Sequence, residues 1–173
     1  MKIIKYFLEF IIIVTFFLVF KILGLRLSSF IGGKIGKFLG PFFRSKKIIN
    51  SNIRRALPNS SSDEIKKISD NMWSNYGKIL SEYMFLKKLR FSKNVTIECK
   101  DILDQIIKND KPVIFVSGHF SSFELMAMMN DRPGVKLAAL YRPLNNFFLN
   151  FVMEHLRKKY ICKNQICYSR TKN

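Results

Sequence analysis

Residues 10–62 contain no acidic residue, and the whole chain is poor in histidine and cysteine. No Asp or Glu occurs between Glu9 and Asp63, whereas nine basic residues lie there. The 173 residues include two histidines and three cysteines, and 30 Lys and Arg against 12 Asp and Glu give a net charge of +18. Such a charge attracts nucleic acid, anionic lipid or an acidic protein, and composition alone does not choose among them.

The motifs of several common enzyme classes are also missing. The sequence has no G-x-S-x-G, no H-E-x-x-H and no G-x-x-x-x-G-K-[ST]. It therefore predicts no serine acyl-enzyme, no multi-histidine zinc site and no nucleotide-binding loop. Cys99, Cys162 and Cys167 lack the spacing of metal ligands, and we interpret them as reduced thiols.

One long apolar segment, YFLEFIIIVTFFLVFKILGL, occupies residues 6–25. Its length matches the hydrocarbon core of a bilayer. The small residues of a cleavage site do not follow it, since the first alanine is Ala56, so we expect an uncleaved anchor and not a signal peptide. A buried core helix is the alternative. Two lysines precede the segment and seven basic residues lie between 21 and 47, which predicts a single-pass anchor with the bulk of the chain in the cytoplasm.

The remaining sequence predicts an α/β fold, with the anchor helix followed by a helical segment and then a mainly parallel sheet with flanking helices. Residues 28–43 are typical of a short amphipathic stretch in the membrane interface, and 61–90 predict one helix that begins with a Ser61/Glu64 capping box. The predicted strands are 95–99, 112–117 and 135–141, and the predicted helices between and after them are 101–109, 122–130 and 146–160. The predicted domains are 1–27 (anchor), 28–92 (basic interfacial and helical region) and 93–173 (partial α/β domain).

The stretch FVSGHFSSFE, residues 115–124, contains a candidate His/Glu pair. His119 follows the predicted strand 112–117, and Arg142 follows the predicted strand 135–141. Because the carboxyl ends of parallel strands meet at one edge of a sheet, we expect these side chains to share a rim. Glu124 would orient the imidazole for general-base work. A turn histidine and a Ser121/Glu124 capping box are the alternative, which spacing alone does not exclude.

Four blocks between residues 48 and 157 resemble one enzyme family. GHFSSFE is similar to the H-x4-E block of the bacterial lipid A biosynthesis (late) acyltransferases, and YRPLNNFFLN resembles their Arg-Pro-x-Asn-Asn-Pro block. Upstream, NIRRALPNSSSDEIKKI and YGKILSEY resemble two further blocks of the family. Ser121 and Ser122 stand where the family usually has Gly-Asn, and Phe147 stands where proline is common.

The resemblance implies a glycerolipid-acyltransferase-like fold, here incomplete, at the bacterial inner membrane. It implies transfer of an acyl chain from acyl carrier protein to a hydroxyl of a lipid A precursor, without a metal or cofactor. His119 and Glu124 are then the catalytic pair, and the implied substrate-binding residues are Arg142, Asn145 and Asn146. The implied partners are acyl-acyl carrier protein, the lipid A precursor and anionic membrane lipid, and not nucleic acid.

Two alternatives remain from the sequence. The family extends beyond the point where this chain ends, so the first alternative is a C-terminally truncated, catalytically inactive, membrane-bound remnant. The second is a basic nucleic-acid-binding module, which the basic residues favour less because they flank an anchor and form no recognised motif.

Overall fold

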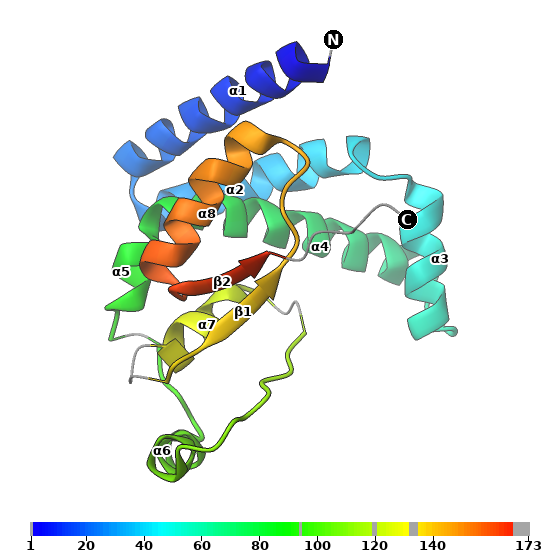
Figure 1. Ribbon diagram of the computed structural model, residues 1–173. Helices are drawn as coiled ribbons and strands as arrows, with labels where there is room; N and C mark the ends of the chain where they lie inside the picture. The colour runs from blue at the N-terminus through cyan, green and yellow to red at the C-terminus, as the bar shows by residue number, and fades with distance from the viewer. Residues whose placement is uncertain (1, 94, 119–120, 132–134, 168–173) are drawn as a thin grey trace, which may run out of the picture. The chain divides into compact units, whose positions relative to one another are not determined.

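The computed structural model describes residues 2–93, 95–118, 121–131 and 135–167 (Figure 1). Contacts divide the chain into two compact units. We call Phe16–Met84 the helical unit, and Met1–Thr15 with Phe85–Asn173 the sheet unit. The elements are α1 (Lys2–Leu23), α2 (Leu25–Leu39), η1 (Gly40–Phe42), α3 (Lys46–Ala56), α4 (Ser62–Glu82), η2 (Tyr83–Phe85), α5 (Leu86–Arg90), α6 (Lys100–Asn109), α7 (Glu124–Asp131), β1 (Ala138–Tyr141), α8 (Phe147–Tyr160) and β2 (Asn164–Cys167), where η marks a 3-10 turn.

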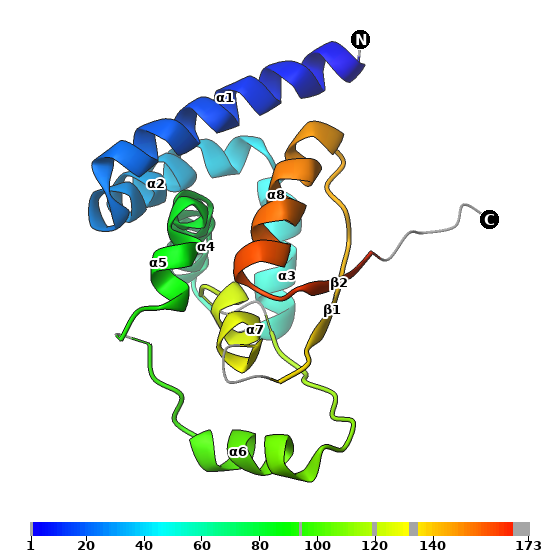
Figure 2. The same ribbon diagram turned by 60° about the vertical axis from the view of Figure 1, so that its left-hand side comes forward.

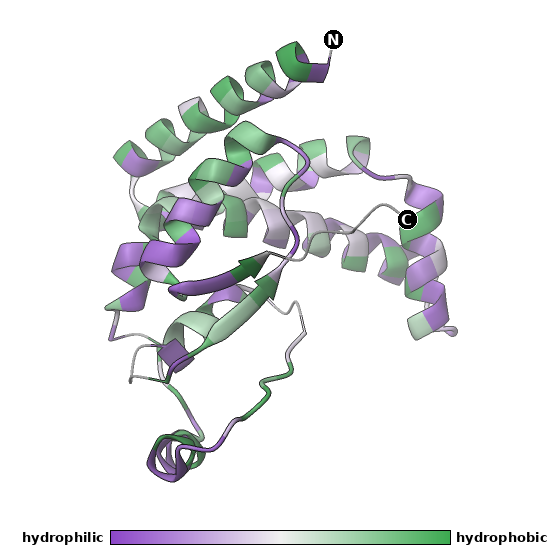
Figure 3. Cartoon of the chain, in the orientation of Figure 1, coloured by the Kyte–Doolittle hydropathy of each residue, from purple (hydrophilic) through white to green (hydrophobic). Residues whose placement is uncertain are grey.

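Helix α1 covers most of the predicted apolar segment 6–25 and begins four residues earlier. By length and composition it is able to cross a membrane, and it is compatible with a single-pass anchor. Figure 3 shows that hydrophobic residues occupy most of its length. Many of them are exposed, including Ile4, Leu8 and Ile12, whereas Phe17 and Phe20 are buried.

Glycines allow α2 and α4 to pack closely in the helical unit. A Cβ added to Gly32 of α2 would lie 2.7 Å from the backbone oxygen of Gly77 in α4. A Cβ added to Gly77 would in turn overlap the Gly32 oxygen, so neither position has room for a side chain. Small residues at such a crossing let two helix backbones approach. The predicted interfacial stretch 28–43 is thus largely a helix that packs on another helix, followed by the η1 turn.

The predicted capping box at the start of α4 is confirmed. The Ser61 hydroxyl accepts a hydrogen bond from the Glu64 backbone N–H at 3.2 Å, and the Glu64 carboxylate accepts one from the Ser61 N–H at 2.7 Å. The helix predicted over 61–90 is interrupted, because α4 ends at Glu82 and the chain continues through η2 into α5.

The sheet unit contains a parallel pair of strands, in agreement with the predicted α/β class. β1 pairs with β2 in the register Ala138↔Asn164 to Tyr141↔Cys167, so the predicted strand at 135–141 is confirmed in its second half. β2 was not predicted, since the sequence analysis assigned no helix or strand after residue 160. Helices α6, α7 and α8 match the other predicted helices within two residues.

The predicted strands at 95–99 and 112–117 are wrong. Both segments are irregular, and Ile114 and Val116 are 90% and 89% exposed, not buried between helices. A strand needs a neighbouring strand to satisfy its backbone N–H and C=O groups, and among the described residues only β1 and β2 pair. The apolar sequence of 112–117 is typical of a buried strand, but the segment has no neighbouring strand with which to pair.

Arg90, the last residue of α5, connects three helices of the sheet unit. Its Nη1 donates to the carbonyl oxygens of Tyr160 and Ile161 at the end of α8, at 2.9 and 3.2 Å. Its Nη2 pairs with the Asp131 carboxylate at the end of α7, at 2.7 Å. The last carbonyl groups of a helix have no partner within the helix. A cation at this end donates hydrogen bonds to them and interacts favourably with the helix dipole. The hydrophobic core beside this cluster includes Leu86, Met128, Met129, Leu149, Met153 and Ile161.

The close approach of α2 and α4 at Gly32 predicts that alanine destabilises the helical unit more at position 32 than at position 33. We expect Gly32→Ala to lower the free energy of unfolding of the helical unit by about 1–3 kcal/mol relative to Gly33→Ala, because the new methyl group meets backbone. At Gly33 the nearest atoms belong to the side chains of Lys78 and Ser74, at 3.0 Å, which can move aside. Both changes raise helix propensity equally, so the difference measures the crossing. Thermal unfolding followed by circular dichroism checks this, and equal midpoints would contradict the close approach.

Candidate active site

The structure places four of the five predicted site residues, since His119 lies outside the described residues. Glu124 begins α7 and is buried, with 9% of its surface exposed. Arg142 and Asn145 are exposed in the segment between β1 and α8. Asn146 is buried at the N-terminus of α8. The predicted common rim of His119 and Arg142 stays a prediction, although the strand expected to lead into His119 is absent.

Glu124 forms a buried ion pair with Arg157 of α8. The Arg157 Nη2 and Nε atoms lie 2.9 and 3.0 Å from the Glu124 Oε1 atom, and the Arg157 and Glu124 side chains are 16% and 11% exposed. A guanidinium presents several N–H groups in one plane, so it can both neutralise the charge of a carboxylate and fix its orientation. This contact fixes the position of Glu124. The sequence analysis missed Arg157, because 33 residues separate the partners and no local motif links them.

The backbone around Ser121 differs from that of an ordinary capping box. Ser121 has a φ of 44°, in the left-handed region, whereas an N-cap residue normally has an extended backbone. Helix α7 begins at Glu124, so this residue is not the third residue of a helix that starts at Ser122. The Glu124 side chain is directed to α8 through its contact with Arg157.

Asn146 has a structural role that the sequence did not indicate. Its Oδ1 atom accepts the backbone N–H of Leu149 at 3.3 Å and caps α8. Its Nδ2 atom donates to the Tyr6 backbone oxygen at 2.8 Å and to the Glu9 carboxylate at 3.1 Å, both in α1. These contacts occupy the Asn146 amide, so among the predicted substrate-binding residues Arg142 and Asn145 are the ones exposed to solvent.

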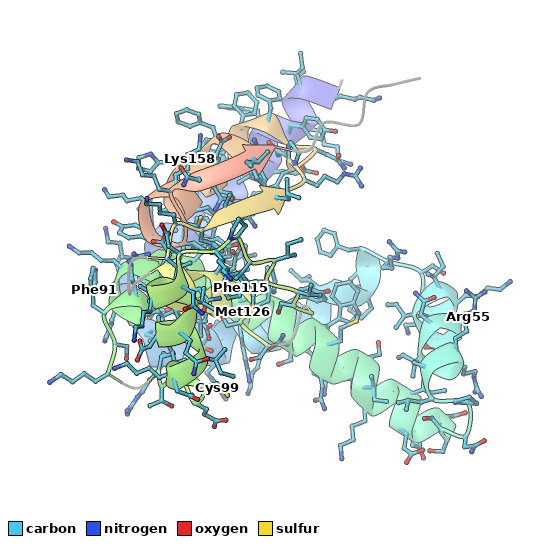
Figure 4. The ribbon with its side chains drawn as sticks, turned by 60° about the horizontal axis from the view of Figure 1, so that its bottom comes forward. Arg55, Phe91, Cys99, Phe115, Met126 and Lys158 are labelled. Carbon is cyan, nitrogen blue, oxygen red and sulfur yellow. The ribbon has the colours of Figure 1, made fainter. Side chains whose placement is uncertain are left out.

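The cysteines differ strongly in their surroundings. Cys162 is buried, and its thiol donates to the Leu137 carbonyl oxygen at 3.0 Å, while Cys99 is exposed (Figure 4). Burial raises the pKa of the Cys162 thiol, so it stays protonated at neutral pH and is a poor nucleophile. Within the part of the chain that the structure describes, no three His, Cys, Asp or Glu side chains form a group able to hold a metal.

We expect iodoacetamide to alkylate Cys99 in the folded chain much faster than Cys162. The thiolate is the reactive form, and both the raised pKa and the burial of Cys162 suppress it. Peptide mass spectrometry after timed labelling at pH 7.5 measures the two rates separately. Unfolding in denaturant should bring the rates together, whereas equal rates in the folded chain would contradict the packing of Cys162.

Loss of Arg157 should destabilise the sheet unit. We expect Arg157→Ala to lower the free energy of unfolding by about 3–5 kcal/mol, because the charge of Glu124 stays buried without its guanidinium. Lys158→Ala is the matched control on the next residue (Figure 4). Lys158 pairs with Glu154 at 2.6 Å one turn away on the surface, and hydrogen bonds from Lys158 and Tyr141 lower the pKa of the Glu154 carboxyl. An exposed pair of this kind contributes less than about 1 kcal/mol.

Denaturant unfolding measures both variants. If Arg157→Ala costs no more than Lys158→Ala, the Glu124–Arg157 pair does not hold α7 against α8. Combining Arg157→Met with Glu124→Gln should recover much of the loss, since no charge then stays buried.

Comparison with known proteins identifies the family. The family model described as bacterial lipid A biosynthesis acyltransferase matches residues 1–163. The chain is also 28% identical over 131 residues to lipid A biosynthesis acyltransferase 2 of Shigella flexneri, an overlap that covers 73% of this chain and 42% of that protein. The chain thus spans less than half the length of this curated relative. No solved structure matches the chain. The chain belongs to the family of bacterial lipid A biosynthesis acyltransferases.

Proposed function

We propose that the protein transfers a fatty acyl chain from acyl carrier protein to a hydroxyl of a lipid A precursor. The family match over residues 1–163 carries the proposal, because it includes both the GHFSSFE and the YRPLNNFFLN segments. Membership of the family supports an acyltransferase of lipid A biosynthesis. The acyl carrier protein donor, the acceptor hydroxyl and the activity of this particular chain belong to the proposal.

His119 serves as the general base in this reaction. It takes the proton of the acceptor hydroxyl as the oxygen attacks the thioester carbonyl, and an ester bond forms as the C–S bond breaks. The proton then passes from the imidazole to the leaving thiolate, so His119 returns to its neutral form. Glu124, held by Arg157, orients the imidazole and stabilises its charged form. A carboxylate that is already fixed and neutralised needs little reorganisation during the reaction.

Arg142 and Asn145 contribute to binding of the phosphorylated acceptor. Both side chains are exposed to solvent. Arg142 directly follows β1, so it lies at the carboxyl end of this strand. Arginine is suited to phosphate because its N–H groups pair with two oxygens at once. Asn146 acts indirectly, by capping α8 and contacting α1.

The charge of the chain supports anionic partners at the inner membrane. The net charge is +18, and the stretch from Glu9 to Asp63 contains basic residues without acidic ones. Acyl carrier protein, a phosphorylated lipid precursor and the cytoplasmic leaflet are all negatively charged. We propose that the catalytic part faces the cytoplasm, where basic residues concentrate beside apolar segments.

Replacement of His119 should abolish transfer. We expect His119→Ala to reduce the rate by about 10²–10⁴-fold, the usual contribution of a general base. His155→Ala is the matched control, because His155 is the other histidine of the chain and is exposed on α8. The assay follows radiolabelled acyl groups from acyl carrier protein to purified lipid A precursor in membranes that contain each variant, with the coenzyme A thioester as a second donor.

Equal activity with and without His119 would overturn the catalytic role of this residue. The Shigella relative serves as the positive control. If that protein transfers the acyl chain and this chain does not, the result favours the alternative of an inactive membrane-bound member.

A further inference from the structure

Two lysine-rich segments that are distant in the sequence lie side by side in the sheet unit. One is α5 with the residues after it, 86–93, and the other is the end of α8 with the residues after it, 157–163. Arg90 joins them, because its Nη1 atom donates to the carbonyl oxygens of Tyr160 and Ile161 at 2.9 and 3.2 Å. Figures 1 and 2 both show α5 beside the last turn of α8, so the two segments contribute to one region of the surface.

The acidic groups that contact these segments are already paired, which leaves a surplus of positive charge. Each carboxylate has its own cation within 2.9 Å, in the pairs Asp131 with Arg90, Glu124 with Arg157, and Glu154 with Lys158. The other cations of the two segments are exposed lysines that form no ion pair with any described residue. These residues, which we call the lysine cluster, are Lys87, Lys88, Lys93, Lys159 and Lys163. Like charges without counter-charges repel one another, so the cluster suits an acidic partner.

One exposed aromatic ring accompanies the lysine cluster. Phe91 directly follows α5 and is 63% exposed (Figure 4). Within the described ranges 85–93 and 154–163, no other large hydrophobic residue is exposed. A helix that inserts into a bilayer surface presents several apolar side chains along one face, whereas interfaces between proteins combine an aromatic contact with a charged rim. This surface therefore fits a folded acidic protein better than a bilayer.

The lysine cluster adjoins the candidate active site. Arg157, which holds Glu124 at 2.9 Å, lies two residues before Lys159 on α8, so about 3 Å separates the two along the helix axis. The Arg157 and Glu124 side chains are mostly buried, whereas Lys159 is exposed. A protein docked on the cluster is thus next to the carboxylate that orients His119 in the proposed reaction.

We propose that the lysine cluster and Phe91 form the docking surface for the acyl carrier protein that delivers the acyl chain. This inference rests on the proposed function, in which that acidic protein is the donor. Opposite charges on two proteins raise the rate of their encounter and set their orientation, and salt screens the effect. The cluster acts on the donor before the chemical step, so its loss raises the KM for acyl carrier protein and leaves kcat unchanged.

Binding of acyl carrier protein to the full chain tests the docking surface without a transfer step. The chain is held in an uncharged detergent, which removes anionic lipid, and holo acyl carrier protein with its free thiol is the probe in surface plasmon resonance. Two variants are compared after circular dichroism shows that they are folded. The cluster variant carries Lys87→Gln, Lys88→Gln, Lys159→Gln and Lys163→Gln. The matched control removes four exposed cations of α3 through Lys46→Gln, Lys47→Gln, Arg54→Gln and Arg55→Gln.

We expect the cluster variant to raise the Kd for acyl carrier protein about tenfold or more, because each exposed charge pair contributes a factor of up to about five. The control variant should change the Kd by less than about twofold, and added salt should weaken binding of the unchanged chain more than that of the cluster variant. Equal losses in the two variants would overturn the proposal. Unchanged carrier binding together with weaker binding of the lipid A precursor would assign the cluster to the acceptor and also overturn it.

Transfer assays separate this proposal from the proposed function. With the acyl carrier protein thioester as donor, the cluster variant should show a raised KM and an unchanged kcat, whereas the control variant should match the unchanged chain in both. A chain that binds the carrier through the cluster but transfers no acyl group would refute the proposed activity and leave the docking surface standing. A cluster variant that transfers with an unchanged KM would refute the docking surface and leave the activity standing.

Discussion

The arrangement of the sheet unit depends on the position of one guanidinium. Arg90 binds the carbonyl oxygens of Tyr160 and Ile161 at the end of α8 and the Asp131 carboxylate at the end of α7. The last carbonyl oxygens of a helix have no N–H partner within the helix. The Arg90 guanidinium donates hydrogen bonds to them, at the end of the helix where the dipole favours a positive charge. Two helices that are separate in sequence thus acquire a common fixed end. The hydrophobic core that contains Met128 and Met153 lies along the same helices.

The two helices that Arg90 joins also carry Glu124 and Arg157. With α7 and α8 held together, Glu124 at the start of α7 lies within 2.9 Å of Arg157 on α8. The ion pair is costly to bury and is useful only where its geometry is maintained. In a family of acyltransferases, a carboxylate five residues after a histidine and fixed by an arginine suits general-base chemistry. Asn146 extends the same connections to α1, so α8 contacts both Glu124 and the apolar helix α1.

Local signals predicted the parts of the fold that local interactions determine. The Ser61/Glu64 capping box and the periodic helices α4, α6 and α8 involve neighbours within a few residues. Strands need partners far away in sequence, so the apolar run 112–117 was wrongly predicted as a strand, whereas the polar residues of β2 gave no strand signal. Glu124 was found from its spacing to His119. Its partner Arg157 was not, because an ion pair across 33 residues leaves no local pattern.

The central claim is that His119 and Glu124 act as one catalytic unit, and a double-mutant cycle of the transfer rate tests it most directly. The rates of His119→Ala, of Glu124→Gln and of the double variant are compared with that of the unchanged chain, after circular dichroism shows that all four are folded. Residues that act as a unit show strongly non-additive losses. The account predicts that Glu124→Gln slows transfer only while His119 is present, so the double variant is no slower than His119→Ala. Additive losses, or unchanged transfer in Glu124→Gln, would contradict it.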